Sequence, residues 1–180
     1  MANILALDPA ARCGWAWSNG FEVESGSADL GVARELGLRD LLCVLVQRFP
    51  VEAVVYELGS FGSRFAHVQR RHNELSGAIM LTAQSLGLEC WSLGPSQWKK
   101  AALGRGNAKK EDVVRLLSLM HRIDVPPLGN GKPDFDRADA IGIVLAARAG
   151  KPMTKKAATK ALIKKLAGSQ TRLFGKGAKK

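Results

Sequence analysis

The sequence predicts an α/β fold, with a mixed five-stranded sheet and helices on both faces, in one domain over residues 1–150. Two strand patterns meet at Asn19-Gly20, a strong turn signal, so the sheet should begin with an antiparallel hairpin. Helix and strand patterns then alternate, which is typical of parallel strands whose connecting helices cover a sheet. A length of 180 residues with 46% hydrophobic residues is enough for one domain with a proper core.

The first three strands are expected near the N-terminus. Residues 3–8 contain the apolar run Ile-Leu-Ala-Leu, which predicts a buried strand that ends in an acid. Residues 14–18 and 21–27 flank the Asn-Gly dipeptide. They predict the hairpin, joined by a two-residue turn.

The middle of the chain predicts alternating helices and strands. Apolar residues spaced three and four apart predict a helix over 32–49, which ends before Pro50. A second apolar run predicts a strand over 51–57. After a Gly/Ser-rich loop at 59–63, a long helix is expected over 65–86.

The last part of the domain predicts one more strand and three helices. The strand is expected over 89–93, and Pro95 is expected to open a short helix. Asn107 is a predicted N-cap for a helix that ends near Met120. The final helix is expected over 136–149.

The long helix at 65–86 carries an apolar seam with alternating spacings of four and three residues. Such a seam either pairs with another helix or packs against the sheet of its own domain, and the pattern allows both. The seam consists of Val68, His72, Leu75, Ile79, Thr82 and Leu86.

The positive charge of the chain is concentrated at its C-terminal end. The net charge is +11, but residues 151–180 hold ten Lys and Arg and no acid, so residues 1–150 are almost neutral. A basic C-terminal tail of this kind favours binding to nucleic acid, with an anionic membrane surface as the weaker option. A solvated tail without a partner is the alternative.

The three cysteines and the N-terminal residues indicate in which cellular compartment the protein is expected. Cys13, Cys43 and Cys90 lack metal-type spacing and lie in apolar surroundings, so we expect reduced thiols in a cytoplasmic protein. An acid at position 8 argues against a signal peptide, and no apolar run approaches the length of a membrane span.

Four acids are the strongest functional signal. Asp8 and Glu57 each end a strand pattern, while Asp136 and Asp139 lie one turn apart where the last helix begins. The four carboxylates can meet if the two strands are adjacent and parallel and the helix starts beside their carboxyl ends. Clustered carboxylates repel one another unless cations neutralise them, and oxygen ligands favour Mg²⁺ or Mn²⁺. In a basic protein, this favours cleavage of phosphodiester bonds in a polyanion.

Each acid also has a simpler explanation when it is taken singly. Asp8 precedes Pro9 and could begin a turn, and Glu57 could be a solvated strand end. The two later aspartates could merely complement the positive end of the helix dipole. Asp134, two residues before Asp136, is a candidate helix cap or outer-shell group.

The order of these motifs resembles a known family. The opening segment Ile4–Pro9 with Gly14, the position of Glu57, and the final Asp-x-Ala-Asp-Ala over 136–140 resemble the RuvC-type Holliday junction resolvases, which are ribonuclease H-like nucleases. Residues 97–110 resemble the family's Q-x-K segment followed by G-x-G-x-A-x-K. The matches run in order from about residue 3 to residue 149, and Ala10 departs from the family's usual Gly.

The resemblance implies a ribonuclease H-like fold and a Mg²⁺-dependent endodeoxyribonuclease that resolves four-way junctions in DNA recombination and repair. It implies two Mg²⁺ ions in each active site, with Mn²⁺ able to substitute. Lys99 and Lys110 would neutralise charge that develops at phosphorus. The implied metal ligands are Asp8, Glu57, Asp136 and Asp139.

The resemblance also implies DNA contacts and partners. The family's base-stacking Phe corresponds to Ser60, so the candidate aromatics are Phe61, one residue later, and the nearby Phe65. Because a junction has two-fold symmetry, a homodimer is implied, with the 65–86 helix as its natural element. Branched DNA is the implied partner, a branch-migration helicase is a further candidate, and no membrane is expected. Candidate backbone contacts are Arg64, Arg70, Arg71, Arg105 and Arg137.

Other functions stay open at the level of sequence. Another ribonuclease H-like nuclease could act on flaps, RNA–DNA hybrid or structured RNA. A non-catalytic junction-binding protein is a different class, although an unused cluster of four carboxylates would be a gratuitous repulsion. Actin-like ATPases share a strand-end Asp but need two such domains and a longer chain.

Overall fold

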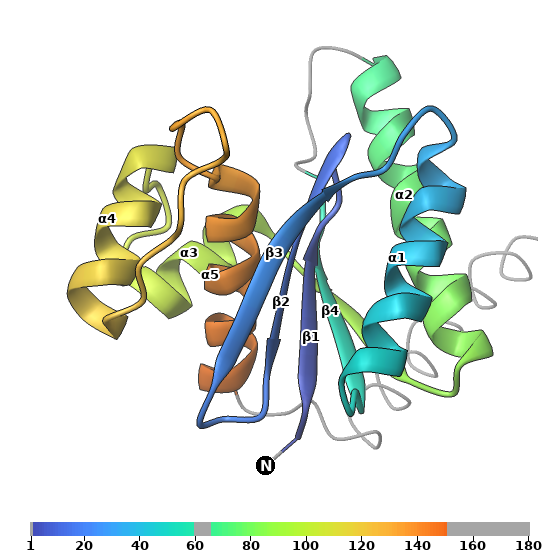
Figure 1. The fold of residues 1–180 in the computed structure, drawn as a ribbon, viewed down its shortest axis with the longest axis horizontal. Helices are drawn as coiled ribbons and strands as arrows, with labels where there is room; N and C mark the ends of the chain where they lie inside the picture. Colours follow the sequence, from blue (N-terminus) through green and yellow to red (C-terminus); the bar gives the residue numbers. More distant parts are fainter. Residues whose placement is uncertain (1, 60–65, 151–180) are drawn as a thin grey trace, which may run out of the picture. The chain divides into compact units, whose positions relative to one another are not determined.

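The computed structural model describes residues 2–59 and 66–150, which form alternating strands and helices (Figure 1). Most elements lie within two residues of the bounds expected from sequence. In chain order they are β1 (Ile4–Asp8), β2 (Arg12–Ser18), β3 (Val23–Asp29), α1 (Arg34–Arg48), β4 (Ala53–Glu57), α2 (Ala66–Ser85), β5 (Glu89–Leu93), α3 (Pro95–Leu103), α4 (Lys110–His121) and α5 (Phe135–Ala149).

The sheet is mixed and has the strand order β3-β2-β1-β4-β5. The pairs β1–β2 and β2–β3 are antiparallel, whereas β1–β4 and β4–β5 are parallel. Parallel neighbours need a crossover connection, and α1 and α2 supply the two crossovers. The predicted mixed five-stranded sheet is confirmed, and its topology places the carboxyl ends of β1 and β4 side by side.

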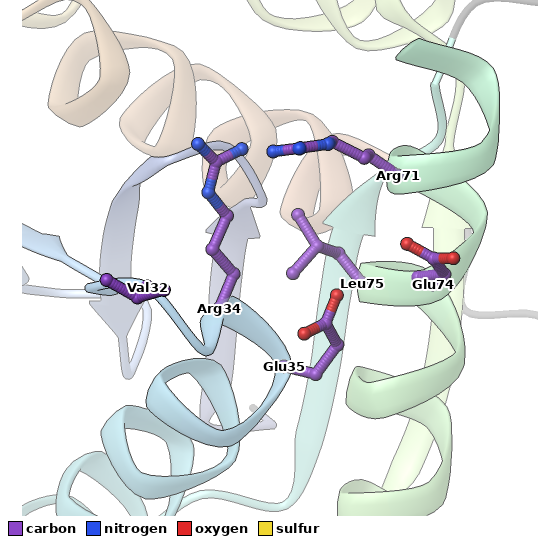
Figure 2. A pocket seen from close by; sticks show the side chains of 6 residues that line it. All are labelled: Val32, Arg34, Glu35, Arg71, Glu74 and Leu75. Carbon is purple, nitrogen blue, oxygen red and sulfur yellow. The ribbon is translucent and has the colours of Figure 1, made fainter. Parts of the chain in front are cut away.

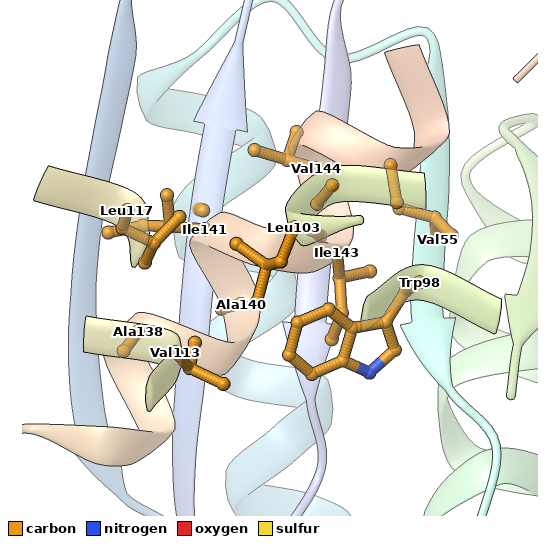
Figure 3. Close-up of a cluster of buried hydrophobic side chains, with 14 of the residues drawn as sticks. Val55, Trp98, Leu103, Val113, Leu117, Ala138, Ala140, Ile141, Ile143 and Val144 are labelled. Atoms are coloured by element: carbon orange, nitrogen blue, oxygen red, sulfur yellow. The ribbon is translucent and has the colours of Figure 1, made fainter. Parts of the chain in front are cut away.

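Helices cover both faces of the sheet. Helices α1 and α2 lie on one face, while α5 lies against β1 and β2 on the other face and contacts α3 and α4 (Figure 1). Because side chains alternate along a strand, β1 contributes to the core on both faces of the sheet. Leu5 and Leu7 pack toward α1 and α2, and Ile4 and Ala6 pack toward α5. Figure 3 shows the hydrophobic core that α3, α4 and α5 form with the sheet.

The hairpin turn is longer than the sequence predicted. The ladder between β2 and β3 closes at the pair Ser18 and Val23, so the loop spans residues 19–22. The side-chain oxygen of Asn19 accepts the backbone N–H groups of Phe21 and Glu22, each at 2.9 Å. The expected two-residue turn is therefore wrong, because this side chain stabilises a wider loop.

The start of α4 also differs from the sequence prediction. Lys109, and not Asn107, occupies the N-cap position. The carboxylate of Asp112 accepts the backbone N–H of Lys109 at 3.3 Å and so satisfies a group at the start of the helix. Asn107 was a plausible cap by residue type, but an acid in the first turn fills that role.

The apolar seam of α2 packs against the sheet of its own domain. Leu75, Ile79 and Thr82 are buried, and the first two belong to the core that contains Leu5 and Leu7 of β1. The explanation by packing on the sheet therefore accounts for the buried part of the seam.

Three further expectations concern the cysteines, the membrane and the tail. Cys13 is buried, Cys43 and Cys90 are partly buried, and all three thiols are free. None of the helices formed by residues 2–59 and 66–150 is long and apolar enough to cross a membrane. The basic tail 151–180 lies outside the described residues, so the proposed boundary at residue 150 stays a prediction.

Candidate active site

Asp8 and Glu57 end two adjacent parallel strands. The register pairs Leu7 with Tyr56, so the two acids follow at the next position of neighbouring strands, which lie about 4.8 Å apart. Side chains alternate along a strand, and Ala6 and Val55 both face the layer of α5. The two acids, one pleat repeat further on, therefore face the same layer.

Gly14 allows the start of α5 to approach these strand ends. It is the register partner of Asp8 in the β1–β2 ladder. A Cβ atom at Gly14 would overlap the backbone carbonyl oxygen of Asp136. Only glycine fits there, and its bare backbone brings Asp136 and, one turn later, Asp139 toward Asp8.

Asp134 fixes the start of α5 on the sheet. Its buried carboxylate accepts the backbone N–H of Arg137 at 3.2 Å, which caps the helix, and the hydroxyl of Ser27 in β3 at 2.6 Å. The Arg137 side chain donates from Nε to the hydroxyl of Ser25 at 2.9 Å. Asp134 is therefore the cap that the sequence suggested, and Arg137 has a structural partner in β3.

The electrostatics show that the four acids form one cluster. Burial raises the pKa of Asp8 well above its usual value, and the charges of Glu57, Asp139 and Asp136 raise it further. Burial, followed by the charge of Glu57, raises the pKa of Asp139 to about 6. Burial also raises the pKa of Glu57 and that of Asp136. The fold thus places four carboxyl groups where the ionised form of each is disfavoured.

Two lysines stand beside the cluster. The ammonium group of Lys110, at the start of α4, lowers the pKa of all four acids, and Lys99 of α3 lowers the pKa of Glu57 and of Asp139. The Lys99 ammonium donates to the carbonyl oxygen of Ala108 at 3.1 Å. The fold therefore brings together all six residues predicted as catalytic, from five different elements.

Trp98 is a site residue that the sequence reasoning missed. Its indole Nε1 donates to the Oε2 atom of Glu57 at 2.5 Å, and its ring is fully buried. A Cβ atom at Gly142 of α5 would overlap that ring. The available signal was a Trp between Gln97 and Lys99, because a buried indole N–H usually finds a partner.

Arg12 is a second missed residue. Its positive charge lowers the pKa of Asp136, and its Nε donates to the hydroxyl of Ser27 at 2.9 Å. It thus joins the network that holds the start of α5 and adds a cation on the β2 side of the cluster.

The donor set fits a hard divalent cation. All four candidate ligands are carboxylates, and the buried Oδ1 atom of Asp139 has no hydrogen-bond partner among the described residues. An unpartnered buried carboxylate oxygen is costly, and a cation would satisfy it. As the side chains are placed, no three His, Cys, Asp or Glu residues within 2–59 and 66–150 are arranged to hold one ion.

The remaining predicted DNA contacts belong to α2, precede α4, or fall outside the described residues. Arg70 pairs with Glu74 at 2.8 Å within α2, and Arg105 is exposed near the start of α4. Arg71 also lies on α2, where it lines a pocket described below. Phe61 and Arg64 fall within residues 60–65, which the structure does not describe.

Comparison with known proteins confirms the resemblance seen in the motifs. The crossover junction endodeoxyribonuclease RuvC of Pseudomonas putida (strain F1) is 28% identical over 156 residues, covering 81% of this chain and 85% of that protein. The enzyme of the same name from Roseiflexus sp. (strain RS-1) is 27% identical over 166 residues, covering 86% of this chain and 95% of its own. No protein-family model matches the chain.

The fold has a counterpart among solved structures. The structure of Thermus thermophilus RuvC superposes with a TM-score of 0.63 at 20% identity, covering 82% of this chain and 93% of that chain. The same protein in complex with a Holliday junction substrate gives a TM-score of 0.65 over the same shares of the two chains. The ribonuclease H-like fold of the RuvC-type proteins is therefore the fold of this chain.

Proposed function

We propose that this chain is a structure-selective DNA endonuclease that resolves four-way junctions by metal-dependent, paired phosphodiester cleavage. The observation that carries the proposal is the convergence of four carboxylates and two lysines at one end of the sheet. The similarity to crossover junction endodeoxyribonucleases over 81% of the chain supports the DNA substrate. The basic composition, with a net charge of +11, suits a polyanionic substrate.

The four carboxylates are proposed to hold two Mg²⁺ ions, for which Mn²⁺ can substitute. Bound there, the ions would lower the pKa of an attacking water and neutralise charge on the scissile phosphate. Asp8 would be a ligand at the centre of the cluster, since the charges of Glu57, Asp136 and Asp139 all act on it. Trp98 would hold one oxygen of Glu57, which leaves the other free to bind metal.

The two lysines are proposed to act on the phosphate. Lys110 lies near all four acids and is exposed, so its ammonium group can reach a substrate above the cluster. Lys99 is held at the carbonyl oxygen of Ala108, so its position is more fixed. Positive charge placed in advance stabilises the extra negative charge of the pentacoordinate transition state.

Paired cleavage is proposed to require a homodimer. One chain provides one cluster of acids, whereas a junction is cut in two strands related by two-fold symmetry. Helix α2 carries the exposed apolar residues Met80 and Leu81, which are candidates for the contact between two copies. Involvement of a branch-migration helicase stays an expectation from the resemblance.

The function can be tested with three labelled substrates: a synthetic four-way junction, the matching linear duplex and an RNA–DNA hybrid. Each is incubated with Mg²⁺ and wild-type protein, Asp8→Asn, or Asp112→Asn. Asp112 is a partly exposed acid in the first turn of α4 and serves as the matched control. We expect paired symmetric nicks in the junction alone, lost in Asp8→Asn and kept in Asp112→Asn.

Other outcomes have defined meanings. Cleavage of the hybrid in preference to the junction would keep the nuclease and change its substrate. Tight junction binding without cleavage in Mg²⁺ or Mn²⁺ would contradict the proposal and leave a binding protein.

A further inference from the structure

A pocket with two arginines lies between α1 and α2 (Figure 2). Its volume is about 190 Å³. The lining comes from the segment before α1, from the first turn of α1, and from the second and third turns of α2. The lining residues are Val32, Arg34, Glu35, Arg71, Glu74 and Leu75.

The two guanidinium groups converge across this pocket. Figure 2 shows Arg34 and Arg71 turned toward one another at the same end, with the carboxylates of Glu35 and Glu74 apart from them. Neither arginine makes an ion pair or a hydrogen bond with another described residue. Two cations that face each other repel, and no carboxylate of the described residues pairs with either one, so the arrangement favours an anion between them.

Other arginines of these two helices are satisfied within the protein. Arg39 and Arg48 of α1 pair with carboxylates at 2.8 Å and 2.9 Å, and Arg70 of α2 pairs with Glu74 at 2.8 Å. The two arginines of the pocket thus differ from their neighbours on the same helices. No acceptor among residues 2–59 and 66–150 uses their N–H groups, which can therefore donate to an external ligand.

The pocket lies at the same end of the sheet as the acid cluster, where β1, β3 and β4 finish. Strand β3 is parallel to β1 because both are antiparallel to β2, so the segment from β3 to α1 leaves the sheet at the end where Asp8 closes β1. Helix α2 follows β4 and starts from this end as well. The pocket belongs to the layer of α1 and α2, whereas the cluster faces α5.

We propose that Arg34 and Arg71 form a clamp that binds one backbone phosphate of the DNA substrate, remote from the phosphate that is cleaved. This inference rests on the proposed function, because it assigns a phosphodiester as the ligand. A guanidinium group offers two parallel N–H donors to a phosphate, and two such groups can hold its two free oxygens. The clamp would fix how the branched substrate lies on the face of α1 and α2.

The test measures junction binding without cleavage. Wild type, Arg34→Gln, Arg71→Gln and the double variant are titrated onto a fluorescent four-way junction in EDTA, at several NaCl concentrations. Arg39→Gln is the control, because this exposed arginine lies on the same helix and already pairs with Asp40. Thermal unfolding of each variant checks that the fold is kept.

Each single variant should weaken binding and reduce the slope of log K against log salt by up to about 0.9, the value for one phosphate contact. Because both arginines hold the same phosphate, the double variant should lose little more than either single variant. Arg34→Lys should restore the slope but only part of the affinity, since lysine keeps the charge and loses the fork. The slope of Arg39→Gln should match that of wild type.

Unchanged affinity and slope in both single variants would overturn the clamp. Additive slope losses would also overturn it, because they would mean two separate phosphates. If inorganic phosphate stabilises wild type but not Arg34→Gln while junction binding is unchanged, the site takes free phosphate and the DNA assignment is wrong. Failure of the proposed function is distinguishable, because wild type would then bind or cut no junction.

Discussion

Replacing Asp139 by Asn is expected to stabilise the metal-free protein while it abolishes cleavage. Asp139 is only 7% exposed, and its Oδ1 atom is buried without a hydrogen-bond partner among the described residues. The charge at this position is therefore an unfavourable feature of the fold without metal. Removing a group that serves a bound cation removes its cost as well.

The magnitude follows from the pKa of Asp139. A carboxyl whose pKa rises from 3.8 to about 6 on folding destabilises the folded protein by about 3 kcal/mol at pH 7. The new amide also needs partners, so about 1–3 kcal/mol of net stabilisation is expected. At roughly 2–4 °C for each kcal/mol in a chain of this size, Tm should rise by several degrees.

The pH dependence has a fixed sign. Because the pKa of Asp139 is raised in the folded state, the folded protein binds more protons than the unfolded chain between pH 3.8 and about 6. The stability of wild type should therefore fall as pH rises through this window. The advantage of Asp139→Asn should be largest at pH 7 and small near pH 4.

The assay is thermal unfolding in EDTA at pH 4, 5, 6 and 7, with junction cleavage in Mg²⁺ measured in parallel. The control is Asp112→Asn, the same chemical change at a position whose side chain is 33% exposed. The backbone N–H of Lys109 lowers the pKa of Asp112, so that substitution should not stabilise the protein. A lower Tm for Asp139→Asn at pH 7 in EDTA, or an advantage that does not depend on pH, would refute the reasoning.

Further predictions concern Trp98, two glycines and the basic tail. Trp98→Phe should raise the Mg²⁺ concentration for half-maximal cleavage about tenfold, since Glu57 loses its indole donor; an unchanged metal titration would contradict this. Gly14→Ala should lower the free energy of unfolding by roughly 2 kcal/mol or more in denaturant titrations, because the new Cβ meets backbone. Gly77→Ala, where a Cβ meets nothing, should instead stabilise by about 0.5–1 kcal/mol. Deleting residues 151–180 should weaken junction binding and flatten its salt dependence; if neither changes, the tail is no DNA contact.

The sequence predicted the layout of the cluster through local patterns. Apolar runs identified β1 and β4, and the acid at the end of each run identified where the strand stops. A three-residue spacing placed Asp136 and Asp139 on one face of α5. These patterns work because alternation along a strand and the helical turn depend on neighbouring residues alone.

Local patterns were less reliable where side chains compete for backbone groups. Asn107 and Asp112 both could have capped α4, and only the path of the chain decided between them. The Asn19-Gly20 dipeptide correctly located the hairpin, but the Asn19 side chain determined the length of its loop. Boundaries of this kind depend on differences of about 1 kcal/mol.

Local sequence patterns were sufficient to predict the fold class, the order of the strands along the chain, and the types of residue that form the acid cluster. Tertiary packing brought together groups that the sequence did not connect: the indole of Trp98 on Glu57, the start of α5 on Gly14, and Arg34 and Arg71 in the lining of one pocket. The two differ in the separation along the chain of the residues that interact. Periodicity and capping are set within a few residues, whereas these contacts join residues that are far apart in the chain and exist only when whole layers pack.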